Sequence, residues 1–396
     1  MVIIIRIDIS KIENWRKVIE FHKDYVENNI LPKLIENINS DISYILLGVN
    51  ELTDKEMINK QLLKLTLGKK EQWTEFIERY NKKILTPEYI IRNEFEKSNS
   101  YSKNIIENIR KRFKDKQDEI IILNKLGEKI NKGTYTPDKK LSLEEKREIM
   151  NGLINDSSVE IIKKIEAIFN YKEFGQGTKW NRNIFLTLTG VEVCPYCNRQ
   201  YITSFNIDEQ NRTTADLDHY YSQSKYPFLA LSIYNFIPSC AICNRNFKND
   251  SDKEVMYPYD ECFDDEDVKF ITDFNDKNEF TYLIGEDLKF NLELTEGKKN
   301  NEEKFKRIEN SKNVFNLENV YFSNKSYVKD LIKRFYYYNE KWIDEVENTY
   351  GSILSLNRTE IIELEFGNYL SAENFSKKPL AKLTKDILDE LGLNIE

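Results

Sequence analysis

Cys194-Pro-Tyr-Cys197 and Cys240-Ala-Ile-Cys243 are two Cys-x-x-Cys knuckles that decide how the middle of this chain folds. Two such knuckles supply four thiolates, enough to surround one zinc ion tetrahedrally and leave no position open for chemistry. Between them lies Asp216-Leu217-Asp218-His219, which holds one of the two histidines in the chain. We therefore expect a structural zinc ion, with His219 as the reactive residue.

The segment between the knuckles has the pattern of a hairpin followed by a helix. Tyr201–Phe205 and Thr213–Asp218 alternate in strand fashion around a polar turn at 208–211. The second strand delivers Asp218 and His219 at its end, and the second knuckle opens a helix from about Ala241 to Asn249. The sequence thus predicts a ββα unit stapled by zinc.

These residues resemble the HNH endonuclease family, whose active unit is a ββα-metal finger. The matching positions are Cys194-x-x-Cys197, Asp218-His219, Asn235, Cys240-x-x-Cys243 and Asn244-x-x-x-Lys248. The resemblance implies that His219 is the general base, that Asp218 and Asn244 bind a divalent cation, and that Asn235 braces the loop and helps orient His219.

Phosphodiester hydrolysis needs these residue types. A neutral imidazole with an ordinary pKa of about 6.5 can take a proton from water near neutral pH. One Mg²⁺ or Mn²⁺ can stabilise the departing oxygen, and a hard cation prefers the carboxylate of Asp218 and the amide oxygen of Asn244. Neighbouring residues on a strand point in different directions, so Asp218 can hold the cation while His219 faces the water.

Three further charged residues lie close to this motif. Asp216 is two residues before Asp218 on the same strand face, and we expect it to support the cation ligands rather than bind the cation. Arg245 and Lys248 lie on the helix that bears Asn244. Each is read either as a phosphate contact or as a solvated helix charge.

A second, wider resemblance covers about residues 180–396. The segments Tyr220–Leu231 and Lys378–Thr384 are similar to HNH proteins that accompany an ATPase in Septu-type and retron-linked phage defence. So are the later positions Asn319, Lys325, Tyr327, Val328, Leu331 and Ile332. The resemblance implies DNA of phage or plasmid as the substrate and a P-loop ATPase, encoded nearby, as a partner. No Gly-x-x-x-x-Gly-Lys-Ser/Thr loop occurs in this chain.

Length and composition predict two or three domains of α+β class, because 396 residues exceed the roughly 250–300 that one core supports. We expect a helical N-terminal domain over 1–175, an HNH core with structural zinc over 176–254, and a C-terminal accessory region of helices with a hairpin over 255–396. Five cysteines, four of them in paired spacings, read as metal ligands in a reducing compartment, with Cys262 as a free thiol.

The net charge of −8 divides unevenly along the chain. Residues 1–250 hold 39 basic and 35 acidic side chains, and residues 251–396 hold 20 and 32. Phosphate attraction depends on the local field, so the negative total does not exclude nucleic acid. No apolar run approaches the roughly 18 residues that cross a bilayer. We expect a cytoplasmic protein without a small-molecule cofactor.

Outside the motif the patterns are weaker. Residues 2–9 suggest a short strand, and helical spacing dominates 11–170, with a Ser142-x-x-Glu145 cap and with His22 on a helix face. Residues 174–178 read as a linker. Basic residues from Lys103 to Lys140 read as a solvated helix face, and the acidic residues of 260–267 as a solvated loop. Residues 280–294 read as a hairpin. Residues 320–350 read as one long helix, on which Phe335–Tyr338 packs into a core or an interface.

The sequence as a whole predicts a zinc-stapled, metal-dependent DNA endonuclease that acts as an antiviral effector. The first alternative is a non-catalytic zinc module that recruits nucleic acid for another enzyme. The second is a regulatory or scaffolding subunit of an ATPase complex.

Overall fold

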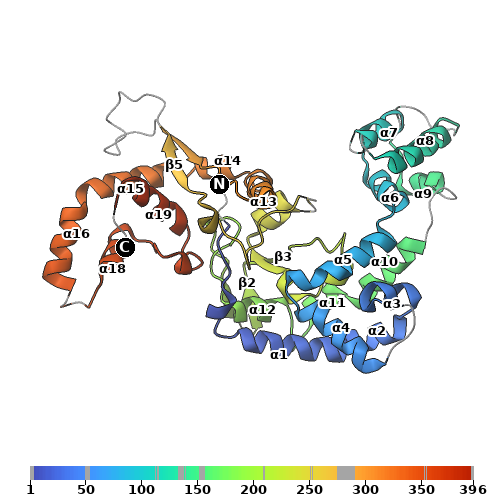
Figure 1. Cartoon of the computed structure of the whole chain (residues 1–396), viewed down its shortest axis with the longest axis horizontal. Coiled ribbons are helices and arrows are strands. Elements are labelled where there is room, and N and C mark those ends of the chain that lie inside the picture. Colours follow the sequence, from blue (N-terminus) through green and yellow to red (C-terminus); the bar gives the residue numbers. More distant parts are fainter. Residues whose placement is uncertain are drawn as a thin grey trace. The chain divides into compact units, whose positions relative to one another are not determined.

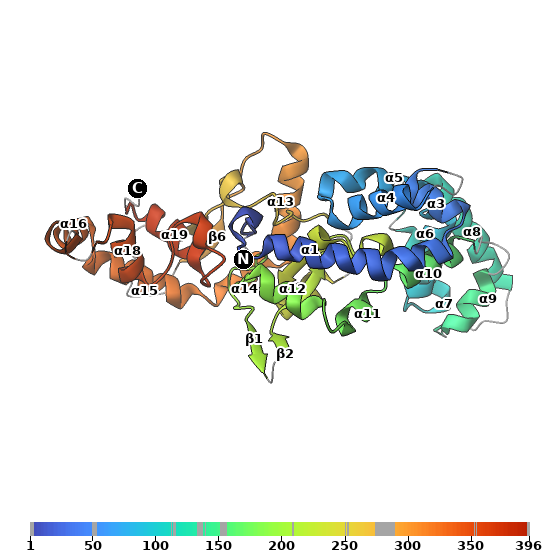
Figure 2. The same ribbon diagram turned by 90° about the horizontal axis from the view of Figure 1, so that it is seen from below.

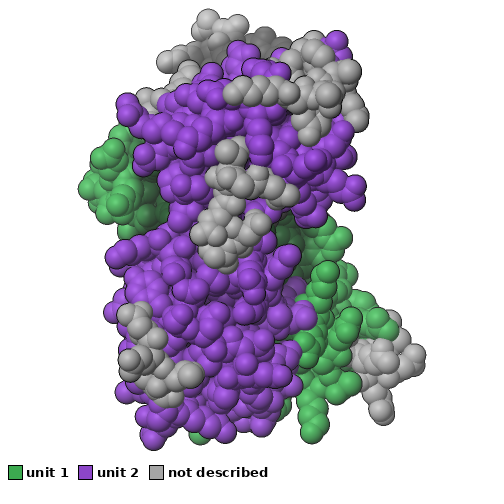
Figure 3. All heavy atoms as spheres, turned by 90° about the vertical axis from the view of Figure 1, so that its right-hand side faces the viewer, with its two compact units in different colours: residues 1–22, 172–224, 234–396 green, residues 23–171, 225–233 purple. Residues whose placement is uncertain are grey.

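The computed structural model describes residues 4–49, 54–111, 113, 116–132, 138, 140–150, 157–207, 210–249, 251, 253–273, 290–351, 353 and 355–393. The chain separates into two compact units (Figure 3). Unit 1 comprises residues 1–22, 172–224 and 234–396, and unit 2 comprises residues 23–171 and 225–233. These units follow other boundaries than the three domain ranges expected from the sequence, and those ranges stay a prediction.

The described residues form a mostly helical α+β structure, as expected from the sequence. Its strands form three separate two-stranded antiparallel sheets, all within unit 1. Figure 1 labels most of the elements along the chain. Because each sheet has only two strands, its stability depends on packing against other elements of unit 1.

Unit 2 is helical, as the spacing of apolar residues predicts. Helix α1 (Trp15–Tyr25) leads into it from unit 1. Its other elements are η2 (Val26–Ile30), α2 (Leu31–Asn37), α3 (Ser40–Leu47), α4 (Lys55–Leu67), η3 (Lys70–Trp73), α5 (Thr74–Ile84), α6 (Pro87–Lys97), α7 (Ser102–Arg110), α8 (Gln117–Lys132), α9 (Leu143–Met150), α10 (Ser157–Ile168) and η4 (Pro227–Leu229).

Side-chain caps begin several of these helices. The Oδ1 atom of Asn39 accepts a hydrogen bond from the Ile42 amide at 2.8 Å at the start of α3. At the start of α9, the Ser142 amide donates to Glu145 Oε2 at 2.8 Å, and the Glu145 amide donates to Ser142 Oγ at 3.2 Å. This reciprocal pair is the capping box predicted from the sequence, and it satisfies amides that a helix leaves unpaired.

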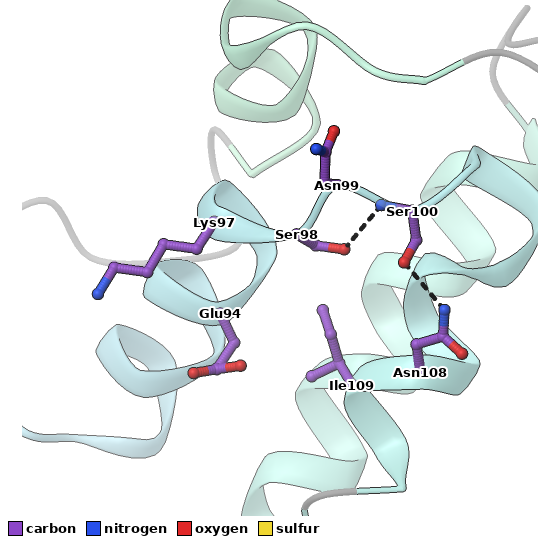
Figure 4. A pocket seen from close by; sticks show the side chains of 7 residues that line it. All are labelled: Glu94, Lys97, Ser98, Asn99, Ser100, Asn108 and Ile109. Atoms are coloured by element: carbon purple, nitrogen blue, oxygen red, sulfur yellow. Dashed lines mark hydrogen bonds between the residues drawn. The ribbon is translucent and has the colours of Figure 1, made fainter. Parts of the chain in front are cut away.

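Helices α6 to α9 share a core of their own and leave one polar hollow at their surface. The core residues include Ile91, Phe95, Ile105, Leu123 and Leu126. The hollow has a volume of about 250 Å³ (Figure 4). Its lining residues are Glu94, Lys97, Ser98, Asn99, Ser100, Asn108 and Ile109. Two of its hydrogen bonds join lining residues to each other, since Ser98 Oγ accepts from the Ser100 amide and Asn108 donates to Ser100 Oγ.

The basic stretch from Lys103 to Lys140 belongs to this helical region. Arg112 and Lys114 lie outside the described residues. On α7, Arg110 donates to Asn124 Oδ1 on α8 at 2.6 Å. This arginine therefore links two helices of unit 2.

Unit 1 contains the two knuckles and all strands. Figure 2 shows the β1–β2 ribbon extending past helix α12. Its elements are η1 (Ile9–Lys11), α11 (Tyr171–Gln176), α12 (Arg182–Thr189), β1 (Ser204–Ile207), β2 (Gln210–Thr213), β3 (Asp216–His219), η5 (Ile233–Asn235), β4 (Phe236–Ser239), η6 (Ile242–Lys248), η7 (Asp264–Glu266), β5 (Phe270–Asp273), β6 (Asn291–Leu294), α13 (Glu302–Val314), α14 (Leu317–Phe322), α15 (Lys325–Tyr337), α16 (Glu340–Val346), η8 (Glu347–Gly351), α18 (Arg358–Phe366), η9 (Ala372–Asn374) and α19 (Ala381–Glu390).

The N-terminal segment runs through unit 1 without forming the expected strand. The amide of Ile5 donates to the Pro195 carbonyl at 2.9 Å, inside the first knuckle, and the amide of Ile7 donates to the Pro258 carbonyl at 2.8 Å. Both isoleucines are buried. The Phe263 amide also donates to the Ile4 carbonyl at 3.0 Å. These isolated bonds give no continuous ladder, so residues 4–8 do not form a strand.

Residues 174–178 are not a linker. Phe174 belongs to α11, is fully buried, and stacks on Phe236 with ring centroids 5.8 Å apart. Trp180 and Phe185 complete this aromatic cluster, and Trp180 Nε1 donates to Nδ1 of His22 at 3.0 Å. His22 is therefore a buried, hydrogen-bonded core residue. The two glycines suggested a linker, but aromatic packing decided the structure of this segment.

The C-terminal region differs from the sequence prediction in two ways. Strand β6 pairs with β5, so the hairpin begins at Phe270 rather than at 280, and residues 274–289 lie outside the described residues. The expected long helix is divided into α14, α15, α16 and η8. Asn339 separates α15 from α16, because its side chain accepts a hydrogen bond from the Trp342 amide and so begins a new helix.

The aromatic run on α15 is divided between packing and exposure. Tyr338 packs against Trp342, whereas Tyr337 is 69% exposed. None of the described helices combines the length and the apolar character that crossing a bilayer requires.

Candidate metal centre and catalytic site

The four knuckle cysteines form one buried cluster, as predicted. Their sulfur atoms all lie within 4.8 Å of one another, and Cys197 Sγ lies 3.9 Å from Cys240 Sγ. A tetrahedral zinc ion with Zn–S bonds of about 2.3 Å sets its sulfurs about 3.8 Å apart. The cluster therefore has the ligand type, number and spacing that a structural zinc ion needs.

The burial of these four thiols together also affects their ionisation. Burial raises the pKa of Cys194, while hydrogen bonds from Cys194 and Cys197 lower the pKa of Cys240. Several thiolates buried together would carry an uncompensated charge, which is costly in a low-dielectric interior. A divalent cation removes that cost and holds all four sulfurs as thiolates.

The first knuckle is anchored by the C-terminal segment that carries the wider sequence resemblance. Asn198 follows Cys197, is fully buried, and adopts a left-handed backbone with φ of 40°. Its Nδ2 donates to the Phe375 carbonyl at 2.7 Å, and its Oδ1 accepts from the Lys382 amide at 3.2 Å. Tyr321 reaches the knuckle as well, since its hydroxyl donates to the Cys197 carbonyl at 2.8 Å.

Segment Lys378–Thr384 therefore supports the four-cysteine cluster. Its last residue, Thr384, is buried and lies within hydrogen-bonding distance of two further side chains. The Tyr327 hydroxyl lies 2.7 Å from Thr384 Oγ1, and Asn368 Nδ2 donates to the same atom at 3.1 Å. Two positions of the wider resemblance, Tyr327 and Thr384, thus meet in one network although they are far apart in sequence.

The strand that carries Asp218 and His219 is paired differently from the prediction. The hairpin expected from 201–205 and 213–218 is instead formed by β1 and β2, with Phe205 opposite Arg212. Strand β3 pairs with β4, so that Asp218 lies opposite Ile237 and His219 opposite Phe236. The chain bends between β2 and β3, where Thr213 Oγ1 accepts from the Ala215 amide.

The sequence β3, β4, η6 is therefore a ββα arrangement with a knuckle at its helix start. The helical segment is a π-helix over Ile242–Lys248, rather than an α-helix to Asn249. Its first turn contains Cys243 and Asn244, and its last residue is Lys248.

Asp218 is held by two buried side chains. It is 3% exposed, and its Oδ2 accepts from the Tyr196 hydroxyl at 2.6 Å. Lys248 Nζ donates to Asp218 Oδ1 at 3.0 Å and lies 2.9 Å from Oδ2. Lys248 is 4% exposed, so it is neither a solvated helix charge nor placed on the open surface. Burial and the Asp218 charge both raise the pKa of Tyr196, which keeps it as the donor.

Asp216 forms a second pair on the same strand face. Arg245 donates Nε and Nη2 to its two carboxylate oxygens at 2.6 and 2.5 Å. Asn244 Nδ2 donates to Asp216 Oδ2 at 3.3 Å. The Arg245 side chain is 68% exposed, so this pair is open to water, unlike that of Asp218. The Asp216 charge raises the pKa of Arg245.

His219 lies at the edge of the aromatic cluster. The residue is 8% exposed, and its ring packs edge-on against Phe236 with centroids 5.4 Å apart. Alternation along β3 directs the Asp218 and His219 side chains to opposite faces of the ladder. The divergence of the two side chains stays a prediction from this alternation, while the His219 backbone carbonyl accepts from Lys248 Nζ at 2.6 Å.

Asn235 braces the loop that follows His219. Its Oδ1 accepts from the Tyr221 amide at 2.7 Å, and its Nδ2 donates to the Tyr221 carbonyl at 3.0 Å. The Tyr220 amide donates to the Asn235 carbonyl at 2.9 Å. Asn235 is fully buried, so these bonds fix the chain directly after His219, which is the bracing predicted for it.

The fit to a divalent cation is incomplete. Asp216, Asp218 and Asn244 are the hard oxygen donors that Mg²⁺ or Mn²⁺ prefers. As placed, however, both carboxylates are paired with basic side chains of this chain, and the partner of Asp218 is buried. A cation at Asp218 would have to displace the Lys248 ammonium, so the roles of Asp218 and Asn244 as ligands stay predictions.

Sequence reasoning missed three features of this site. It did not assign Tyr196 a role, although this residue lies inside the first knuckle. It did not pair Lys248 with Asp218 or Arg245 with Asp216. The helical spacing put both basic residues near the strand, but only the fold shows which carboxylate each one meets.

The acidic cluster at 260–267 is not a solvated loop. Glu261 pairs with Arg307 at 2.5 Å, and Glu266 pairs with Lys304 at 2.8 Å. Asp264 pairs with the buried Lys382 at 3.1 Å. The run of acidic residues suggested a solvated loop, but basic residues that are distant in sequence pair with several of them in the folded chain.

Cys262 lies apart from the metal cluster as a buried free thiol. Burial raises its pKa to about 11.

No family model, no curated protein and no solved structure matches this chain.

Proposed function

We propose that this chain is a metal-dependent endonuclease of HNH type that hydrolyses phosphodiester bonds in DNA. One observation supports this most strongly. A buried four-cysteine cluster joins the first knuckle to the second, which directly follows the β3–β4 ladder and begins η6, with Asp218 and His219 at the end of β3 and Asn244 at the start of the helical segment. This is the order of residues and elements that the sequence resemblance implies.

In this proposal His219 is the general base. Its loop is held by Asn235, and its backbone carbonyl is held by Lys248, so the imidazole has a fixed position from which to take a proton from water. An Mg²⁺ or Mn²⁺ ion, when bound, supplies positive charge for the phosphate and the departing oxygen. The four cysteines would hold a zinc ion that joins the first knuckle to the start of η6, and a closed four-sulfur site would leave no position open for the reaction.

The substrate and partner belong to the proposal as well. Phage or plasmid DNA is the expected substrate, and a P-loop ATPase supplied by a neighbouring gene is the expected partner in an antiviral role. The support is the sequence resemblance over about residues 180–396. Its C-terminal segment supports the zinc centre through the bond between Lys382 and Asn198. Co-purification of the ATPase with the tagged chain tests the partner.

A non-catalytic zinc module that binds nucleic acid is the second candidate. Two observations favour it, since Asp218 is neutralised by a buried lysine and His219 is only 8% exposed. A module that only binds DNA needs no accessible base.

Plasmid nicking separates the two candidates. Supercoiled plasmid is incubated with the protein and Mg²⁺ or Mn²⁺, and His219→Ala is compared with Lys385→Met, a surface variant on α19. The endonuclease proposal predicts nicking that His219→Ala abolishes and Lys385→Met retains, with the bound zinc unchanged in both. Plasmid that stays intact under every metal, with and without the ATPase, would leave only the binding module.

A further inference from the structure

The Lys248 side chain occupies an unusual position for a lysine. The residue is 4% exposed, and lysine is among the residues least often buried without a partner. Its ammonium has two acceptors in β3, the carboxylate of Asp218 at 3.0 Å and the backbone carbonyl of His219 at 2.6 Å. The ammonium thus bridges a side chain and the backbone of two successive residues.

The two acceptors lie on the strand, and the donor lies at the end of η6. Because Lys248 is the last residue of η6, its side chain ties the far end of the segment to the end of β3, while Cys243 ties the near end to the zinc cluster. Strand β3 is therefore held to η6 at both of its ends, Asp216 by Arg245 and His219 by Lys248.

A bond to the His219 carbonyl acts on the imidazole through the backbone. The carbonyl fixes the peptide plane after His219, and that plane, with the Asn235 bonds to Tyr221, sets the direction of the Cα–Cβ bond of His219. Catalytic groups lose activity when they move by about 1 Å. A residue that holds the peptide plane of the base is thus expected to affect turnover without contacting substrate.

We propose that Lys248 is a positioning residue for His219, which clamps the end of β3 to η6 through its hydrogen bond to the His219 carbonyl. The proposal rests on the proposed function for its effect on turnover, but the clamp itself does not. It assigns to Lys248 a role other than phosphate contact, because a buried ammonium with two internal acceptors is not presented to DNA.

Arg245 provides the matched comparison. It is three residues earlier on the same helical segment and also pairs with an aspartate of β3, Asp216. Its side chain is 68% exposed, however, and it donates to the Asp216 carboxylate rather than to the His219 backbone. If only the loss of a positively charged side chain near β3 mattered, Arg245→Met and Lys248→Met should have the same effect.

The first experiment tests the clamp by NMR and needs no activity assay. The chain has two histidines, so protein labelled with ¹³C at histidine Cε1 gives two ring signals, and His219→Ala identifies the one from His219. We expect Lys248→Met to shift or broaden the His219 signal and leave that of His22 in place. We expect Arg245→Met to leave both signals in place. A His219 signal unchanged in Lys248→Met would overturn the proposal.

Removing the ammonium leaves Asp218 buried without its cation, so Lys248→Met is at risk of misfolding. The double variant Asp218→Asn/Lys248→Met removes both charges and leaves the His219 carbonyl without the Lys248 donor. Asp218→Asn alone keeps that donor. The clamp predicts a changed His219 signal in the double variant and an unchanged one in Asp218→Asn; the reverse pattern would show that the carboxylate, not the carbonyl, matters.

The second experiment uses plasmid nicking at saturating Mn²⁺. We expect Lys248→Met to lower kcat about 10- to 100-fold, the usual loss when a supporting residue of a site is removed, with KM for DNA unchanged. A phosphate contact would instead raise KM for DNA with kcat unchanged, and a Lys248→Met kcat equal to that of the unchanged protein at saturating Mn²⁺ would show that the clamp does not position the base; either result would overturn the proposal. If no variant nicks DNA but the NMR result holds, the proposed function fails and the clamp stands.

Discussion

Replacing Lys382 should lower the free energy of unfolding of unit 1 more than replacing an exposed residue of the same helix. Lys382 is fully buried on α19, and its ammonium lies 2.8 Å from Asp386 Oδ1 and 3.1 Å from Asp264 Oδ1. Burial by itself would lower the pKa of Lys382, but Asp386 and Asp264 hold that pKa above its ordinary value. Lys382→Met keeps much of the side-chain volume and removes the charge.

The size of the effect follows from burial. Removing one partner of a buried ion pair leaves the other charge uncompensated and costs about 3–5 kcal/mol. Lys385 on the same helix pairs with Asp389 at 2.5 Å, with both side chains about a quarter exposed, and exposed pairs contribute roughly 0.2–1 kcal/mol. Lys385→Met is therefore the matched control, and we expect the two free energies of unfolding to differ by at least about 2 kcal/mol.

Equilibrium urea unfolding measures the difference. Three of the four tryptophans lie in unit 1, so a Trp73→Phe background makes tryptophan fluorescence report that unit alone. The Lys382 amide also donates to Asn198 beside the first knuckle, so Lys382→Met should release zinc at a lower urea concentration.

A double variant tests the electrostatic origin. Asp386→Asn removes the charge while its amide oxygen can still accept from the Phe270 amide, which now donates to Asp386 Oδ2 at 2.9 Å. Lys382→Met/Asp386→Asn should be more stable than Lys382→Met, with a coupling of about 0.5–3 kcal/mol. Equal losses for Lys382→Met and Lys385→Met, or no recovery in the double variant, would refute the reasoning.

Three further predictions concern unit 1. Cys243→Ser should lower bound zinc, measured by elemental analysis, from one ion per chain to a small fraction, because a closed four-sulfur site loses a ligand; full zinc content would contradict the assignment. Cys262, with its pKa raised from 9.0 to about 11, should react with iodoacetamide at pH 8 about 100-fold more slowly in the folded than in the unfolded chain. Since the folded pKa is the higher one, its contribution to stability is present below about pH 9 and is lost as pH rises to about 11, which urea midpoints across that range would show. Asn235→Asp keeps the acceptor for the Tyr221 amide but loses the donor to the Tyr221 carbonyl, so thermal unfolding should show a loss of about 1–3 kcal/mol, and an unchanged midpoint would exclude the bracing role.

The sequence by itself determined the parts of this protein that depend on local spacing. Two Cys-x-x-Cys knuckles can close one metal site only if they meet, and the folded chain brings their sulfurs within 4.8 Å of one another. Helical periodicity predicted unit 2, and Ser142-x-x-Glu145 predicted a helix start that the structure contains. Caps and periodicity involve residues within one or two turns, so their outcome is visible in a short window of sequence.

Only the tertiary structure decided the partners of the charged residues. The pairs Lys248 with Asp218, Glu261 with Arg307, and Lys382 with Asp264 join residues that are 30, 46 and 118 positions apart. Strand β3 likewise chose β4 over β2, because antiparallel pairing is settled by which faces become buried and not by proximity along the chain. The local sequence around a charged residue does not show whether its side chain is solvated or paired with an opposite charge. Long-range packing determines which of the two occurs.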